Sequence, residues 1–333
     1  PAAAETLIAG KKAFSSLPEN AARAELVKTV EATITEAVGA GRVVMDDVIG
    51  LDDAKRALEE AITFPRVMAS MGMPAAFTKG VLLYGPPGTG KTQLARAQAT
   101  SAGCTFFAVT ASSIMSKWLG ESEKLVRALF DAARYYAPSI VFIDEVDALT
   151  GERGGGGEHE AMLRVKNELL AQLDGMSSGA PDPDKMVLSL GATNRPWALD
   201  EAFRRRFEKR ILIPLPDSPM REALLRRSMR ASAVDADVNY PGIAARTLDY
   251  NCADIVQVCR DAIVGPLREL AARMKSEGVP VSQMLTYVTE KGIKPNTVAQ
   301  RHFDDALRRI KSSSGGKDAS ARLDAWAAEF GST

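Results

Sequence analysis

Cysteine and histidine are scarce in this 333-residue chain, which has three cysteines and two histidines. Cys104, Cys252 and Cys259 are odd in number and lack the spacing of a metal site, so we expect reduced thiols rather than disulfides. His159 and His302 have no second histidine or cysteine near them in the sequence, which argues against metal binding. The sequence therefore does not support a disulfide-stabilised or zinc-binding protein.

The chain also lacks an excess of charge and any long apolar run. Lys plus Arg and Asp plus Glu are equal at 42 each, so the bulk charge neither favours nor excludes a polyanionic partner. No segment approaches the roughly 18 consecutive apolar residues of a membrane span, and no secretory signal opens the sequence. With 46% hydrophobic and 25% charged residues, the composition is typical of a soluble globular protein.

Five short apolar segments alternate with longer helical patterns between residues 79 and 216. Each has the length of a strand and most end in a turn or a polar residue, which predicts βαβ units and a mostly parallel sheet. Beyond Pro214, Pro216 and Pro219 only helical patterns follow. The five predicted strands span residues 80–84, 105–109, 140–143, 186–190 and 210–214.

These patterns predict four parts of the chain. Residues 1–45 are a lead-in in which residues 21–38 have helical spacing, and residues 46–216 are an α/β domain. Residues 217–311 are a smaller helical domain, and a last helix at 318–333 follows a Ser- and Gly-rich segment. The four consecutive glycines at 154–157 cannot build a core, so they predict a mobile loop.

Residues 85–92, Gly-Pro-Pro-Gly-Thr-Gly-Lys-Thr, fit the phosphate-binding pattern G-x-x-x-x-G-K-[ST] between a predicted strand and a predicted helix. The glycines let backbone N–H groups point at phosphate oxygens, and the helix that follows adds its dipole. Lys91 would reach the β- and γ-phosphates, and the Thr92 hydroxyl would hold Mg²⁺. We therefore expect ATP and Mg²⁺ to bind here, with contacts from Gly85, Pro86, Pro87, Gly88, Thr89, Gly90, Lys91 and Thr92.

Two further polar groups follow predicted strands. Asp144 and Glu145 come after four apolar residues, at the carboxyl end of a strand, where ligands bind in parallel α/β sheets. Asp144 could complete the Mg²⁺ shell, and Glu145 could activate the attacking water. Asn194 alone is typical of a turn, but beside these motifs it is a candidate to position that water.

Arg204, Arg205 and Arg206 form a basic run ten residues after Asn194. Such a run is usually a solvated surface or a nucleic-acid patch. Phosphoryl transfer, however, gains much from a guanidinium that a neighbouring subunit brings to the γ-phosphate. A ring in which each subunit supplies Arg205 and Arg206 to the next one would account for the run and would complete the site.

Together, the sequences GPPGTGKT, IVFIDEVDAL and GATNRPWALDEAFRRRFEKR resemble the AAA ATPases. More narrowly, the chain resembles the clade of katanin, spastin, fidgetin and the ATPase that dismantles ESCRT-III, over residues 40–333. ARYYAPS, GGEHEA, ADIVQVCRDA and WAAEFGS are similar to katanins, whereas KWLG and DALTG are similar to the ESCRT-III ATPase. The resemblance implies an AAA+ α/β domain with a helical lid, ATP in the cleft between them, and a homo-hexamer.

The same resemblance implies roles for three more segments. Lys117, Trp118 and Leu119 would form the first pore loop, in which Trp118 grips a threaded polypeptide. The mostly polar neighbours of Trp118 argue against a tryptophan in the core. His159 would lie in the second pore loop. The segment expected to flank the adenine is Val48, Ile49 and Gly50.

Two positions depart from the family pattern. The family places Gly-Tyr-Ser-Gly-Ala-Asp at the start of a lid helix, where this chain has Asp-Tyr-Asn-Cys-Ala-Asp. Cys252, next to Ala253, thus replaces a glycine that lies against the nucleotide, which predicts weaker nucleotide binding. Leu119 replaces a basic residue that suits the acidic tails of tubulin in katanins.

The resulting hypothesis is an ATP-driven homo-hexameric motor, cytoplasmic and associated with the cytoskeleton, that severs microtubules by pulling on tubulin tails. Two alternatives stay open: disassembly of ESCRT-III polymers on membranes, and a nucleotide-dependent scaffold with little turnover. No nucleic-acid partner is expected. Because the sequence begins with Pro1, we also expect a missing amino-terminal module that could bind a regulatory or adaptor subunit.

Overall fold

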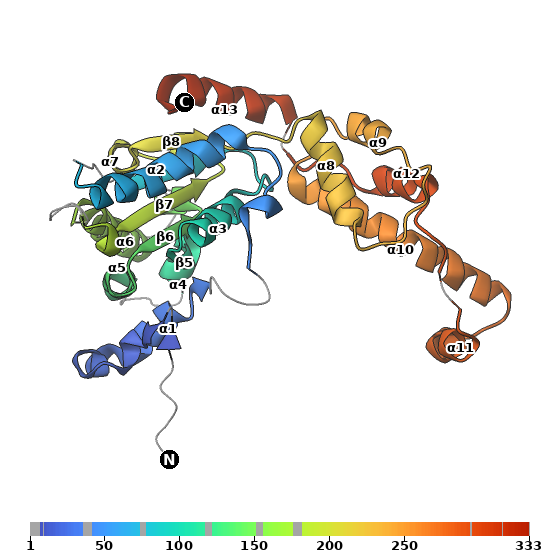
Figure 1. Ribbon diagram of the computed structural model, residues 1–333, viewed down its shortest axis with the longest axis horizontal. Coiled ribbons are helices and arrows are strands. Elements are labelled where there is room, and N and C mark those ends of the chain that lie inside the picture. Colours follow the sequence, from blue (N-terminus) through green and yellow to red (C-terminus); the bar gives the residue numbers. More distant parts are fainter. Residues whose placement is uncertain are drawn as a thin grey trace, which may run out of the picture. The chain divides into compact units, whose positions relative to one another are not determined.

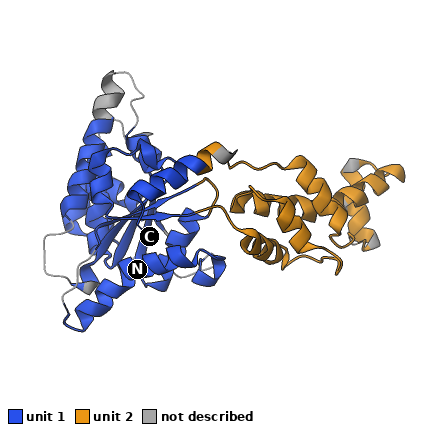
Figure 2. Cartoon of the chain, turned by 90° about the horizontal axis from the view of Figure 1, so that it is seen from above, with its two compact units in different colours: residues 1–85, 90–213, 321–333 blue, residues 86–89, 214–320 orange. Residues whose placement is uncertain are grey.

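The computed structural model describes residues 7–8, 10–35, 42–73, 78–116, 122–150, 156–175, 182–293, 295–314 and 316–332. The chain divides into two units (Figures 1 and 2). Unit 1 contains residues 1–85, 90–213 and 321–333, and unit 2 contains residues 86–89 and 214–320. Unit 1 is therefore built from distant parts of the sequence, and the middle of the phosphate-binding loop belongs to unit 2.

A six-stranded sheet forms the centre of unit 1, in the order β3-β5-β6-β7-β4-β8. β4 to β8 are parallel, whereas the short β3 pairs antiparallel with β5. The five strands predicted from the sequence are confirmed, with small changes at their ends. The strands of the sheet are β3 (Ile34–Thr35), β4 (Gly80–Tyr84), β5 (Thr105–Thr110), β6 (Ser139–Asp144), β7 (Val187–Thr193) and β8 (Lys209–Leu212).

Helices cover both faces of this sheet. In β4, Leu82 and Tyr84 belong to one hydrophobic cluster with α5 and α6, whereas Val81 and Leu83 belong to a second cluster with α2 and α3. Parallel strands buried on both faces have near-continuous apolar sequences, which explains why the strands could be found without alternation. The helices of unit 1 that follow the amino-terminal segment are α2 (Asp52–Ser70), α3 (Lys91–Ser101), α4 (Ala111–Ser116), α5 (Ser122–Tyr135), α6 (Gly156–Gly175) and α7 (Glu201–Arg206).

The amino-terminal segment packs onto unit 1. α1 (Ala24–Glu31) contacts α5, and Tyr136 Oη donates a hydrogen bond of 2.6 Å to Glu31 Oε1. The helix predicted over residues 21–38 is wrong at its end, because the chain leaves the helix after Glu31 and the β-branched pair Ile34–Thr35 joins the sheet. A two-stranded ribbon precedes α1, formed by β1 (Leu7–Ile8) and β2 (Lys11–Lys12).

The last helix, α13 (Gly316–Phe330), brings the end of the chain back to the sheet of unit 1. Trp326 meets the ring of Tyr84 edge-on, with 4.5 Å between the ring centroids. Ser332 N donates a hydrogen bond of 2.8 Å to Arg210 O in β8. The carboxyl-terminal segment is therefore part of the core that supports β4 and β8.

The part of unit 2 after residue 213 consists of helices around a separate hydrophobic core, in which Leu225, Val258 and Phe303 are fully buried. The helices of unit 2 are α8 (Ser218–Met229), α9 (Tyr240–Arg246), α10 (Cys252–Ser276), α11 (Met284–Lys291) and α12 (Gln300–Arg309).

Among the described residues of both units, no helix is both long and apolar enough to span a membrane. The short 3₁₀ helices of the chain are η1 (Phe14–Ser16), η2 (Pro18–Arg23), η3 (Met45–Asp47), η4 (Val146–Leu149), η5 (Pro183–Lys185), η6 (Pro196–Ala198) and η7 (Val281–Gln283).

Candidate nucleotide-binding site

The phosphate-binding loop leaves β4 at Gly85 and enters α3 at Lys91. Gly85 has a φ of 151°, and a Cβ there would lie 2.1 Å from the carbonyl oxygen of Ile213, so only glycine fits. Gly90 has a φ of 94°, a left-handed conformation that sets the start of α3. The first N–H groups of a helix have no partner within it, so this loop and helix end are suited to an anion.

Lys91 is held inside this loop. Its Nζ donates hydrogen bonds to Gly85 O at 3.0 Å and to Asn194 Oδ1 at 2.7 Å. The residue is only 7% exposed, and burial lowers the pKa of Lys91 to about 8, while the charges of Asp144 and Asp147 oppose that shift. Lys91 and Asn194, which were predicted from separate motifs, are therefore in contact.

The acidic pair lies beside the start of α3. Thr92 Oγ1 donates a hydrogen bond of 3.2 Å to Asp144 Oδ2, so the hydroxyl and the carboxylate predicted to hold Mg²⁺ are adjacent. Oxygen atoms of this kind are the ligands that Mg²⁺ prefers. Glu145 is exposed and has a φ of 54°, a left-handed conformation that costs a non-glycine residue about 1–3 kcal/mol. Strain of this kind is typical of functional sites, where the surrounding structure enforces it.

Asp147, which was not among the predicted site residues, links two of these strand ends. Its buried carboxylate accepts hydrogen bonds from Thr193 Oγ1 at 2.7 Å and from Arg195 Nε and Nη2 at 2.9 and 2.7 Å. The contact joins the turn after Glu145 to the segment that carries Asn194. A signal was present in the sequence, because Asp-Glu-Val-Asp places a second Asp two residues after Glu145.

Within unit 2, the first turn of α10 contacts residues 86–89 of the phosphate-binding loop. Ala253 N donates a hydrogen bond of 3.1 Å to Gly88 O, and Cys252 Sγ lies 3.7 Å from Thr89 O. Burial raises the pKa of the Cys252 thiol to about 11, so the side chain is a neutral thiol at neutral pH. The side chain that replaces the family's glycine is therefore packed directly against the loop.

Asn251 fixes this contact from the helix end. Its side chain caps α10 by accepting a hydrogen bond of 2.8 Å from Asp254 N, as expected for Asn before a helix. A Cβ on Gly88 would lie 2.7 Å from the Asn251 side chain, so the close approach of cap and loop requires the glycine.

The predicted adenine-flanking segment packs in the same hydrophobic cluster as α3. Val48 is buried, and Lys55 Nζ donates a hydrogen bond of 2.6 Å to its carbonyl oxygen. Ile49 is partly buried, and Gly50, two residues before the start of α2 at Asp52, has a φ of 61°. Contact of these residues with adenine stays a prediction.

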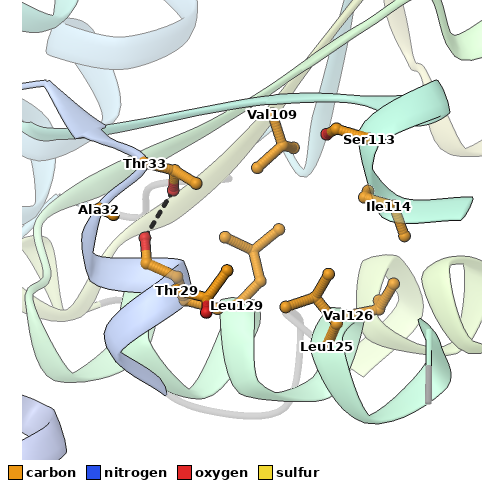
Figure 3. Close-up of a pocket in the computed structure, with 10 residues that line it drawn as sticks. Thr29, Ala32, Thr33, Val109, Ser113, Ile114, Leu125, Val126 and Leu129 are labelled. Atoms are coloured by element: carbon orange, nitrogen blue, oxygen red, sulfur yellow. Dashed lines mark hydrogen bonds between the residues drawn. The ribbon is translucent and has the colours of Figure 1, made fainter. Parts of the chain in front are cut away.

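A cavity of about 190 Å³ lies between α1, α4 and α5 (Figure 3). Its hydroxyl groups are bound within the protein: Thr33 Oγ1 donates to Val30 O at 2.7 Å, and Ser113 Oγ donates to Thr110 O at 2.8 Å. The lining is therefore mainly apolar, and none of the predicted nucleotide contacts is part of it. It is formed by Thr29, Val30, Ala32, Thr33, Val109, Ser113, Ile114, Leu125, Val126 and Leu129.

Comparisons with known proteins show the family to which the chain belongs. Residues 81–215 match the model of the ATPase family associated with various cellular activities (AAA). A solved structure of katanin, described as the structural basis for its self-assembly, is 38% identical to the chain with a TM-score of 0.75, and covers 90% of this chain and 96% of its own. The chain belongs to the AAA ATPase family. Its core is thus a nucleotide-binding AAA domain with a parallel sheet.

Three further relatives extend this comparison. The FIGL-1 AAA domain in complex with ADP is 36% identical, with a TM-score of 0.78 over 93% of this chain and 98% of its own. The katanin p60 ATPase-containing subunit A1 of Arabidopsis thaliana is 47% identical, and the meiotic spindle formation protein mei-1 of Caenorhabditis elegans is 44% identical, each over 86% of this chain. The matches cover 54% and 59% of those two proteins, so the chain spans somewhat more than half of their length.

The two arginines predicted to act in trans in an AAA ring lie away from the phosphate-binding loop of their own chain. α7 ends at Arg206 beside the start of β4, where a Cβ on Gly80 would lie 2.5 Å from Arg206 O. The loop follows the opposite end of β4, about 13 Å along the strand. Arg206 Nε and Nη2 bind Asp174 at 3.0 and 2.7 Å, and Arg205 pairs with Glu201.

The predicted pore loops are described only in part. Residues 117–119 lie outside the described residues, and so do Gly154 and Gly155. α6 contains His159, whose side chain is not described. The helix begins at Gly156, so the mobile loop predicted over residues 154–157 is wrong for its last two glycines.

Proposed function

We propose that the chain is the motor part of a katanin-like enzyme that hydrolyses ATP with Mg²⁺, assembles as a homo-hexamer and severs microtubules by pulling on tubulin. One observation carries the proposal: the predicted groups meet at one edge of the sheet, Lys91 with Asn194 and Thr92 with Asp144. The identity of 47% to a katanin p60 subunit supports the choice of substrate.

The residues of one chain can hold the nucleotide and the attacking water. Lys91 Nζ carries three N–H donors, so it can bind phosphate oxygens and still keep a bond to Asn194. Mg²⁺ bound at Thr92 and Asp144 would neutralise phosphate charge. Glu145, exposed at the end of β6, would take the proton of the water, and Asn194 would hold that water in line.

Arg205 and Arg206 would complete the site of the neighbouring subunit. Within one chain, the Arg206 side chain is 29% exposed and is paired with Asp174, whose side chain is 56% exposed. Arg206 Nη1 also donates a hydrogen bond of 3.2 Å to Ala202 O. A surface ion pair contributes about 0–1 kcal/mol, so the guanidinium can exchange the carboxylate for a phosphate at little cost. The solved katanin structure described in terms of self-assembly supports the assembly that this step needs.

We assign the motor to the cytoplasm and the cytoskeleton, with tubulin as substrate. The two relatives are katanin p60 and a meiotic spindle formation protein, which supports a substrate among microtubules. A regulatory or adaptor subunit is a further proposed partner, in keeping with a chain that spans about half the length of these relatives. We propose no nucleic-acid partner.

Fluorescence imaging of labelled microtubules with this chain and ATP tests the substrate. We expect filaments to break along their length with the wild-type chain and to stay intact with Trp118→Ala, which should still hydrolyse ATP because the predicted pore loop is not part of the phosphate site. Leu119→Arg should improve severing by attraction to acidic tubulin tails, and higher salt should weaken that gain, because charges are screened over about 10 Å at 0.1 M salt.

Each alternative function has its own outcome when ESCRT-III polymers, ATP binding and ATP turnover are assayed beside the microtubules. Intact microtubules together with disassembled ESCRT-III polymers would replace the katanin-like function by ESCRT-III remodelling. Tight ATP binding without turnover would show a nucleotide-dependent scaffold. Severing that continues unchanged in Trp118→Ala would reject the pulling mechanism but not the substrate.

A further inference from the structure

The buried carboxylate of Asp147 joins the two segments that carry Glu145 and Asn194. It accepts Thr193 Oγ1 through Oδ1 and the guanidinium of Arg195 through Oδ2, at 2.7 to 2.9 Å. We propose that Asp147 is a positioning residue for hydrolysis, which fixes Glu145 and Asn194 relative to each other so that both can hold one water molecule. The inference rests on the proposed ATPase activity and concerns the geometry of that same site.

Asn194 is clamped on both sides by this network. The hydroxyl of Thr193 donates to Asp147 and also accepts a hydrogen bond of 2.9 Å from Arg195 N. The side chains before and after Asn194 are thus both bound to Asp147, Thr193 through its hydroxyl and Arg195 through two guanidinium nitrogens. With its neighbours fixed, the Asn194 side chain is directed to Lys91, where it accepts the hydrogen bond of 2.7 Å.

The other end of the network acts on Glu145. This residue has a left-handed backbone conformation, which persists only where the surrounding structure enforces it. The turn that follows begins with the hydrogen bond of 2.8 Å from Ala148 N to Glu145 O, and Asp147 lies in the same turn. Bound to Thr193 at the end of β7, Asp147 holds that turn, and with it the direction in which the Glu145 carboxylate points.

Asp147 is suited to position other groups rather than to react. Its side chain is 8% exposed, and both carboxylate oxygens already accept hydrogen bonds. Burying a carboxylate is unfavourable unless it is paired, and well-packed apolar residues often stabilise a fold as well as a buried ion pair does. Stability alone therefore does not explain a buried charge at this position. A carboxylate is explained if its role is to fix the direction of three hydrogen bonds. A misplacement of about 1 Å in a reacting group can cost on the order of 100-fold in rate.

Thr193→Val and Thr193→Ser form a matched pair for testing this role. Valine keeps the shape of threonine but cannot donate to Asp147, whereas serine keeps the hydroxyl. With the assembled chain, we expect Thr193→Val to lower kcat about 10- to 100-fold and to change the Kd for ATP by less than about threefold. Thr193→Ser should retain kcat within about threefold of wild type. The measurements are steady-state hydrolysis, calorimetric binding of ATP to the Glu145→Gln background, and the melting temperature of each variant.

Asp147→Asn provides a second measurement if Thr193→Val does not fold, because asparagine keeps the size and an oxygen for Thr193 while it loses the pairing with Arg195. A kcat equal to wild type in the folded variant would overturn the positioning role. A parallel loss of ATP affinity and kcat would overturn it too, since Asp147 would then shape the nucleotide pocket. These results are distinct from a failure of the proposed function, in which the wild-type chain itself would show no turnover and the role of Asp147 would be rejected with it.

Discussion

The two ends of the parallel sheet in unit 1 use their charged groups in different ways. At the carboxyl end, Lys91 is 7% exposed and its contact with Asn194 lies within one chain. At the amino end, the Arg205 side chain is 72% exposed, and it and Arg206 pair with carboxylates of their own chain. The nucleotide-binding residues are therefore held by local packing, whereas Arg205 and Arg206 are held by surface ion pairs that a neighbouring molecule can displace.

Glu145 tests the carboxyl end of the sheet. Glu145→Gln should lower the rate of ATP hydrolysis by about 10²- to 10⁴-fold and leave ATP binding intact, because the amide cannot take the proton of the attacking water. The variant should accumulate as an ATP-bound hexamer, which size-exclusion chromatography with light scattering would detect. Wild-type turnover in Glu145→Gln would remove Glu145 from the mechanism and leave this end of the sheet as a binding site only.

Mixed rings test the amino end of the sheet. Arg206→Ala rings should be nearly inactive, since a trans arginine contributes about 10³- to 10⁵-fold to phosphoryl transfer. Lys91→Ala rings should be nearly inactive because they lose the lysine that binds the β- and γ-phosphates. A mixture of the two subunits should recover part of the activity, at interfaces where an intact arginine meets an intact phosphate-binding loop. The hydrolysis rate measured against the mixing ratio shows this recovery.

Arg204 is the matched control for that experiment, because it lies over the ring of Phe330, 5.0 Å from the ring centroid, within its own chain. Arg204→Ala should lower the melting temperature while pure rings continue to hydrolyse ATP. If Arg206→Ala rings hydrolyse ATP at the wild-type rate, Arg206 does not act on the site of the neighbouring subunit.

The smallest expected effect concerns the thiol packed against the phosphate-binding loop. Cys252→Gly should tighten ATP binding by a few-fold, which is less than about 1 kcal/mol, with little change in kcat. Cys252→Ser, which keeps nearly the same size, should bind ATP as the wild type does. Calorimetry compares the three proteins, and equal dissociation constants would show that the loop already accommodates the sulfur.

The strands of the sheet were predicted from the sequence, and so were the polar residues that meet at its carboxyl edge. Buried parallel strands leave an apolar run of recognisable length, as in β4 (Gly80–Tyr84), which was predicted with its observed bounds. The contact between Lys91 and Asn194 could also be expected from the sequence, because the motifs that contain them each follow a strand of the same sheet. Motif spacing thus places groups at a common edge without any knowledge of side-chain contacts.

The remaining features depend on contacts between segments far apart in the chain. Residues 21–38 have helical spacing, yet Ile34–Thr35 pairs with β5, a preference that local periodicity does not contain. The role of Asp147 depends on Thr193, in another strand. The pairing of Arg206 with Asp174, at the end of α6, could not be predicted from the sequence either.

The packing of α13 onto β4 has a consequence for protein synthesis. Tyr84 and Trp326 lie in the same core but at distant points of the sequence, with all of unit 2 between them. Because chains emerge from the ribosome amino terminus first, the sheet of unit 1 stays without α13 until all of unit 2 has been synthesised. We therefore expect β4 to reach its full stability only after the end of the chain has emerged. Pulse proteolysis of ribosome-bound chains that end before α13, compared with the released full chain, would show this as a β4 that becomes resistant only in the full chain.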